Sequence, residues 1–239
     1  MADHDGGAGE TNGEPLSRRA RTGVPAARDT SRGRLPPHQA LYFYGVSRAR
    51  SWRRARAGGA DAALPITLVR YRDLDAMVAP VEWEMPVLDE DRVRAHHEAV
   101  EAASRRATVL PAPFGIVFRG RRQLIRMMQD QYLVLDEGLA LLDGHWELRL
   151  HIVAGTGAEP DLELSDVAMS LYSELRRSAR AAEPFPADGR RLMSAAFLVE
   201  RAHWLEFMDR AEELDGAHPE VTFDITGPWP AYDFVRIAV

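Results

Sequence analysis

Apolar residues recur with two different periods along this chain, and the two periods predict a mixture of strands and helices. In the first half, three short runs rich in aromatic and β-branched residues are typical of strands. The third run is apolar enough to lie in the centre of a sheet. The predicted strands cover residues 41–46, 66–71 and 75–81, with Arg72-Asp73-Leu74 as the turn between the last two.

Helical spacing begins after these strands. Asp89 is a good helix N-cap, and the residues that follow it repeat on one face until about residue 106. The buried stripe of this helix is predicted to contain Val93, His96 or His97, Val100 and Ala103. A histidine at the contact between this helix and the sheet is the simplest interpretation of the His96-His97 pair.

The first half ends with an extended segment and a long helical one. Residues 109–118 are interrupted by Pro111 and Pro113, which suits an edge strand because proline cannot donate to a sheet ladder. Residues 121–142 predict one long helix. Its inward face is expected to consist of Leu124, Met128, Leu135, Leu139 and Leu142.

The second half has its own alternation. Apolar residues at 146, 148, 150 and 152 alternate with Glu147, Arg149 and His151, which predicts a half-buried strand. We interpret His145, Glu147 and His151 as members of its exposed face. Helices are predicted over residues 162–181 and 200–214, and strands over residues 192–199 and 221–225.

This order of elements predicts an α+β protein in which helices are layered on mixed or antiparallel sheets. The second half is close to the split βαβ order of ferredoxin-like domains. Residues 1–40 hold almost no large apolar side chains and predict a disordered tail. We therefore expect domains at residues 41–143 and 144–239, the second of them ferredoxin-like.

Composition removes several kinds of chemistry. The 239 residues include no cysteine and no lysine, which excludes disulfides, thiolate nucleophiles, Schiff bases and the lysine of a phosphate-binding loop. The net charge is −6, and residues 1–40 carry six arginines against five acids, so the acidity lies in the remaining residues. An acidic body argues against nucleic-acid binding. No apolar run reaches the ~20 residues of a membrane span, so we expect a cytoplasmic protein.

Candidate catalytic and metal-binding groups are weak. Neighbouring histidines on a helix point about 100° apart, so His96 and His97 do not share one ion. The Gly155-Thr156-Gly157 loop lacks the third glycine of a dinucleotide-binding turn, because Pro160 stands there. We predict no catalytic, cofactor-binding or metal-binding residue and no small-molecule substrate. A metal-dependent hydrolase that uses His97, Glu98 or His151 remains the enzymatic alternative.

Two segments combine proline, glycine and aromatic residues. They are either irregular sheet edges packed on helices or stiff aromatic surfaces for a partner, since buried tryptophan and tyrosine dominate binding hot spots. The first contains Pro111, Phe114, Gly115 and Phe118. The second contains Gly227, Pro228, Trp229, Pro230, Tyr232 and Phe234. These ten residues are our candidate partner contacts, called the signature residues below.

With these segments the chain resembles the gas vesicle protein F/L family (GvpF/GvpL). The similarity covers about residues 41–239 and follows the family's order. It rests on Leu41-Tyr42-Phe43-Tyr44-Gly45, Tyr71-Arg72-Asp73-Leu74-Asp75-Ala76, the helix around His96-His97-Glu98, Val109-Leu110-Pro111 with Phe114 to Phe118, Ala196-Phe197-Leu198-Val199, and Thr226 to Val235. Ala231 and Asp233 stand where the family usually has proline and serine.

The resemblance implies a two-domain α+β protein with a minor, non-enzymatic role in building gas vesicles, the gas-filled protein shells that give cells buoyancy. The implied partners are the small apolar major shell protein and other minor vesicle proteins. An adaptor that contacts only the accessory proteins is the alternative. The implied location is the gas vesicle and the cytoplasm.

Overall fold

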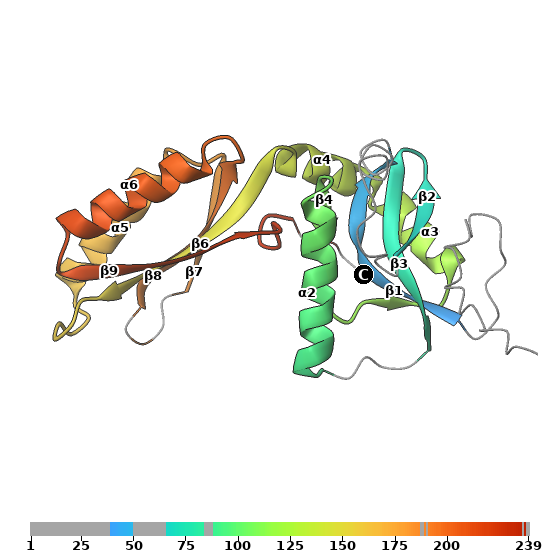
Figure 1. The fold of residues 1–239 in the computed structure, drawn as a ribbon, viewed down its shortest axis with the longest axis horizontal. Coiled ribbons are helices and arrows are strands. Elements are labelled where there is room, and N and C mark those ends of the chain that lie inside the picture. The colour runs from blue at the N-terminus through green and yellow to red at the C-terminus, as the bar shows by residue number, and fades with distance from the viewer. Residues whose placement is uncertain are drawn as a thin grey trace, which may run out of the picture. The chain divides into compact units, whose positions relative to one another are not determined.

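Two antiparallel sheets, each with its own helices, form the described part of the computed structural model (Figure 1). The structure describes residues 39–49, 66–83, 88–186, 189, 191–235 and 237. Residues 1–38 of the predicted tail therefore lie outside the described residues, whereas Gln39 and Ala40 belong to a strand. The predicted α+β class is confirmed.

The first sheet has the strand order β2-β3-β1-β4, and β5 also pairs with β1. Its strands are β1 (Gln39–Arg48), β2 (Thr67–Tyr71), β3 (Leu74–Glu82), β4 (Val109–Pro111) and β5 (Val117–Phe118). Strand β3 lies between β2 and β1, as its apolar sequence predicts. The proline-containing strand β4 lies at the edge, also as predicted.

Gly45 allows the backbone of β4 to approach β1 closely. It has φ +147°, and a Cβ added there would lie 2.4 Å from the carbonyl oxygen of Leu110. The register of β1 against β3 shifts at this position, between Phe43 and Gly45. A glycine bulge thus brings the backbone of β4 close to β1.

Helix α2 (Glu90–Ser104) begins as the sequence predicts. The Asp89 side chain accepts hydrogen bonds from the backbone N–H groups of Asp91 and Arg92. The buried face consists of His96, Ala99, Val100, Ala103 and Ser104. It packs with Met77 and Val109 in a small apolar cluster.

The predicted single helix over residues 121–142 is wrong. The structure has two helices, α3 (Arg121–Asp130) and α4 (Tyr132–Leu142), which meet at Gln131 with φ −107° and ψ 15°. The break lets both apolar stripes reach the same core. These stripes are Leu124, Met127 and Met128 on α3, and Leu135, Leu139 and Leu142 on α4.

The second sheet confirms the ferredoxin-like prediction. Its antiparallel strands are β6 (His145–Ala154), β7 (Ala181–Phe185), β8 (Arg191–Glu200) and β9 (Val221–Trp229), in the order β7-β8-β6-β9. Helices α5 (Leu162–Arg176) and α6 (Trp204–Ala217) connect them and cover one face of the sheet (Figure 1). Leu148, Leu150 and Ile152 pack there against Phe197 and Phe207.

Three predictions in this half need correction. The helix expected to continue to residue 181 ends at Arg176, and strand β7 follows it. Strand β7 was missed because Ala181–Phe185 has no β-branched residue and contains Pro184. The helix expected from residue 200 begins at Trp204, and β9 extends beyond the predicted Ile225 to Trp229.

After β9 the chain returns to the first sheet. Ala231 and Ile237 are buried in the same apolar cluster as Phe43, and Phe234 and Val235 pack against that cluster. The return segment, residues 230–235 and 237, therefore completes the core of the first sheet. The division into domains at residues 143 and 144 stays a prediction.

Candidate partner-binding surface

Three motifs that are far apart in the sequence meet in one aromatic cluster. The Phe114 ring lies 5.8 Å from His96, His96 lies 5.7 Å from His97, and His97 lies 5.3 Å from Tyr232, measured between ring centroids. Tyr42 of β1 joins the cluster, 5.6 Å from His96. The structure thus brings the two signature segments together through the histidine pair of α2.

His96 holds the first signature segment against the helix. Its Nε2 lies 3.0 Å from the carbonyl oxygen of Ala112, and its Nδ1 lies 2.9 Å from the Tyr42 hydroxyl. A neutral ring with the proton on Nε2 donates to Ala112 and accepts from Tyr42. Burial lowers the pKa of His96 to about 4, so the ring is neutral near pH 7. The predicted role at the helix–sheet contact is confirmed.

Glu147 contradicts the prediction that it lies on an exposed face. Its side chain is fully buried, although it belongs to the face of β6 that no helix covers. Its Oε1 accepts from Nε of Arg149 at 2.8 Å, and its Oε2 accepts from the backbone N–H of Asp233 at 3.0 Å. The return segment buries it, which no local pattern predicts. Burial raises the pKa of Glu147 to about 7.

Arg149 and Asp233 complete this polar contact, which the sequence analysis did not predict. Nη2 of Arg149 lies 2.8 Å from Oδ2 of Asp233. The contact therefore links β6 to a residue 86 positions away. A charge that alternates with apolar residues looks like ordinary solvent exposure, so the sequence offered no signal for this contact.

Most signature residues are packed rather than exposed. In the first segment Pro111 and Phe118 are buried, and Phe114 and Gly115 are partly buried. In the second, Pro230 is buried, and Pro228, Tyr232 and Phe234 are partly buried. Only Gly227 and Trp229 among the ten are exposed, and Trp229 keeps 43% of its surface accessible.

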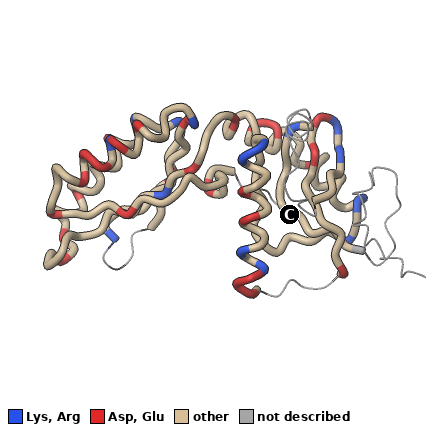
Figure 2. Tube along the Cα trace, viewed as in Figure 1, with Lys and Arg blue, Asp and Glu red and all other residues tan. Residues whose placement is uncertain are grey.

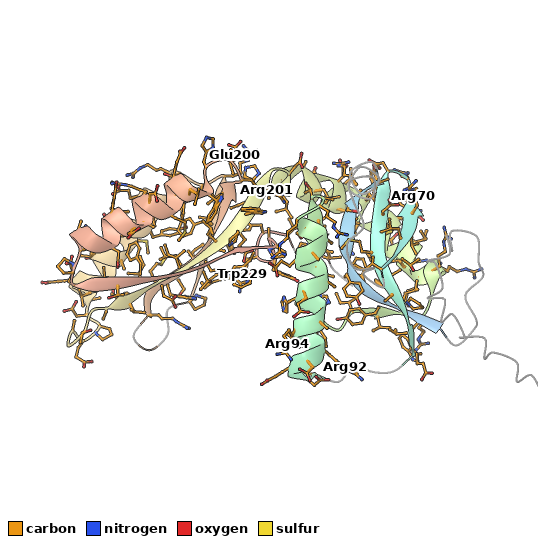
Figure 3. The ribbon with its side chains drawn as sticks, in the orientation of Figure 1. Arg70, Arg92, Arg94, Glu200, Arg201 and Trp229 are labelled. Carbon is orange, nitrogen blue, oxygen red and sulfur yellow. The ribbon has the colours of Figure 1, made fainter. Side chains whose placement is uncertain are left out.

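Trp229 is held in place although it is exposed (Figure 3). Its indole Nε1 donates to Oγ1 of Thr226 at 3.2 Å. Gly227 has φ +128°, and a Cβ there would lie 2.9 Å from the carbonyl oxygen of Glu147 and 3.3 Å from Cδ1 of Trp229. Only glycine therefore lets β9 approach β6 so closely and keeps the space beside the indole clear.

Trp229 belongs to the face of the second sheet that α5 and α6 leave uncovered. It pairs with Glu147 on β6, and directly paired residues of antiparallel strands point to the same side. Asp224 and His151 form another pair on this face. The helix-free face therefore combines an exposed indole with polar side chains.

The outer edge of β9 is poorly suited to accept another strand. The backbone N–H of Phe223 donates to Oδ1 of Asp215 at 2.7 Å, and that of Val221 donates to the carbonyl oxygen of His218 at 3.1 Å. Donors satisfied in this way are not available for pairing with a partner strand. The side-chain face, rather than the strand edge, is the candidate contact.

The geometry does not support a metal site at the histidines or a nucleotide site at the Gly155-Thr156-Gly157 loop. Within the described part of the chain, no three His, Asp or Glu side chains gather as metal ligands would. His151 instead lies 2.8 Å from Oγ of Ser194. Gly155 is explained by close packing, because a Cβ there would lie 2.9 Å from the carbonyl oxygen of Glu220. None of the described helices is long and apolar enough to span a membrane.

Comparison with known proteins places the chain among gas vesicle proteins. The family described as "Gas vesicle synthesis protein GvpL/GvpF" matches residues 40–163 and 158–236. Gas vesicle protein F2 of Halobacterium salinarum is 27% identical over 203 residues, which cover 83% of this chain and 93% of the relative. Gas vesicle protein L of a Streptomyces species is 27% identical over 227 residues, covering 73% and 84%.

Solved structures share the fold. The crystal structure of gas vesicle protein GvpF from Anabaena sp. PCC7120 superposes with a TM-score of 0.69 at 15% identity, covering 84% of this chain and 98% of the other. That of GvpF from Microcystis aeruginosa superposes with a TM-score of 0.67 at 14% identity, covering 82% and 99%.

Proposed function

This chain belongs to the gas vesicle synthesis protein GvpL/GvpF family, and from this membership we propose that it is an accessory protein that binds the major shell protein during gas vesicle formation. A shell subunit that will line a gas space exposes apolar surface before assembly, and such surface aggregates. An acidic, soluble partner that covers this surface holds the subunit ready for nucleation. Other minor vesicle proteins are its further partners, and the gas vesicle and the cytoplasm are its locations.

Trp229 is the observation that carries this proposal. Its indole remains 43% exposed, while the other aromatic signature residues are buried or partly buried. The hydrogen bond to Thr226 fixes the ring before any partner arrives, which reduces the entropy lost on binding. Trp229 and the helix-free face around it are therefore the proposed contact surface.

Coexpression with the major shell protein tests this role. The wild-type chain should raise the soluble fraction of the shell protein and co-purify with it. Trp229→Ala should weaken binding about 30-fold, because a buried hot-spot tryptophan contributes ~2 kcal/mol or more. Its thermal unfolding should change little, since the side chain is exposed.

Leu205→Ala is the matched control. Leu205 is 58% exposed on α6, on the opposite side of the same sheet. Equal losses in both variants, or a shell protein whose solubility is unchanged by the wild-type chain, would contradict the proposal. Pairwise interaction mapping that finds contacts with accessory proteins alone would support the adaptor role instead.

We propose no catalytic role. The hydrolase alternative requires a stoichiometric metal ion near His97, Glu98 or His151, and elemental analysis of the purified protein tests it directly. A metal bound in equimolar amount and lost in His151→Ala would overturn this part of the proposal.

A further inference from the structure

An open hollow lies where β5 passes into α3. It has a volume of about 360 Å³ and is lined by Arg119, Gly120, Arg122, Gln123 and Arg126. The three arginines are exposed; Arg122 and Arg126 lie one turn apart on α3, and Arg119 precedes the helix. Figure 2 shows positive positions gathered along the first turns of α3.

These arginines differ from others on the helices of this protein. Arg92 and Arg94 pair with Asp89 and Asp91, and Arg105 pairs with Glu101. Among the described residues, no carboxylate lies within ion-pair distance of Arg119, Arg122 or Arg126. Like charges three or four positions apart repel each other. No carboxylate of the described residues therefore compensates the positive charge of this cluster, on a chain whose net charge is −6.

Local contacts hold Arg119 at this hollow, and the space beside Gly120 is open. The Arg119 guanidinium lies over the Trp83 ring, 4.9 Å from its centroid, and the backbone N–H of Arg119 donates to Oε1 of Gln123 at 2.8 Å. At Gly120, with φ +150°, no atom lies within 4 Å of where a Cβ would be. The first turn of α3 contains no acidic residue, although helices favour acids there.

We propose that this hollow binds the carboxylates of an acidic peptide segment of a partner protein. The planar guanidinium fork matches a carboxylate in bidentate geometry, and three such groups suit two or three acidic side chains. The hollow is too small for a duplex, and the acidic remainder of the chain repels an extended polyanion or an anionic membrane more than it repels a short acidic peptide. The site lies on the first sheet and is independent of the Trp229 surface that carries the proposed function.

Fluorescence anisotropy with the full-length protein tests this site. The probe is a fluorescein-labelled oligoglutamate of about eight residues, long enough to contact all three arginines. Arg122→Gln/Arg126→Gln should weaken its binding at least about tenfold, because charge-assisted hydrogen bonds are lost. Added salt should weaken binding to the wild-type chain.

Arg92→Gln/Arg94→Gln is the matched control, because it removes the same charge from exposed positions on α2 (Figure 3). This pair should change the affinity less than about twofold, because it removes only long-range, screened charge. Equal losses in both double variants, or no binding to the wild-type chain at low salt, would overturn the proposal. So would tighter binding of an oligothymidylate of equal charge, or displacement of the peptide by an equimolar amount of inorganic phosphate. Solubility of the coexpressed shell protein is a separate readout, so failure of this site and failure of the proposed function are distinguishable.

Discussion

Single residues illustrate both what local sequence patterns reveal and what they miss. The cap at Asp89 follows from neighbours within one helical turn and was predicted, and helical spacing predicted that His96 or His97 is buried. Glu147 looked like a solvated residue because it alternates with apolar ones. Its burial depends on Asp233, and no local period extends that far. His96 and Glu147 are buried titratable groups whose pKa values shift in opposite directions, so their protonation changes stability with opposite signs.

The pH dependence of stability should reveal Glu147. Its folded-state pKa of about 7 lies above its ordinary value, so the native carboxyl takes up a proton before the unfolded chain does. Glu147 should therefore contribute a rise of roughly 1 kcal/mol to the free energy of unfolding as the pH falls from about 8 to about 6.5. His96 offsets part of this rise as the pH approaches 6.5, because its lowered pKa means that the unfolded chain binds the proton first.

Urea unfolding of Glu147→Gln at these two pH values checks the prediction. The variant should lose the rise, whereas Glu212→Gln, at an exposed position on α6, should keep it. A slope that survives in Glu147→Gln would show that another group titrates in this range.

At the scale of elements, periodicity predicted most strands and helices because their apolar faces are regular. It failed at β7, a short strand with Pro184, and at Gln131, where α3 ends and α4 begins. Both depend on tertiary packing. At a helical glycine, local preference and packing can also disagree. Helix propensity favours alanine over glycine by about 1 kcal/mol, but close packing can leave no room for a Cβ.

Two helical glycines should respond to alanine in opposite directions. A Cβ at Gly138 on α4 would lie 2.7 Å from Cδ1 of Leu110 and 2.9 Å from Cγ1 of Val235. Gly138→Ala should therefore lower the free energy of unfolding by about 1–2 kcal/mol through overpacking. At Gly216 on α6 nothing lies within 4 Å, so Gly216→Ala should raise it by about 0.5–1 kcal/mol. Chemical denaturation measures both, and a stabilised Gly138→Ala would refute the close-packing argument.

At the scale of the whole molecule, the order of elements predicted the ferredoxin-like sheet but not how the chain joins its two halves. Arg201 is one such link (Figure 3). Its Nη2 donates to the carbonyl oxygen of Ser104 at the end of α2, at 3.2 Å, and its guanidinium lies 5.3 Å from the centroid of the Trp146 ring. Both contacts join segments far apart in the chain, which a period within one segment does not encode.

Arg201→Gln should lower the free energy of unfolding by about 1–2 kcal/mol, because it removes a charged donor from a partly buried carbonyl. Arg105→Gln is the control, since Arg105 is exposed and pairs only within its own helix. That variant should change stability by less than about 0.5 kcal/mol. Calorimetry measures both, and equal effects would mean that Arg201 does not link the halves.

The return of residues 230–235 and 237 to the first sheet has a consequence for biosynthesis. A ribosome makes the strands of that sheet early, but Ala231, Phe234 and Ile237 are made only after the whole second sheet. Until then the apolar core of the first sheet is incomplete, so part of its apolar surface stays exposed during synthesis. A label fused close behind residue 237 would lie next to the buried Ile237 and would hinder the packing of these late side chains.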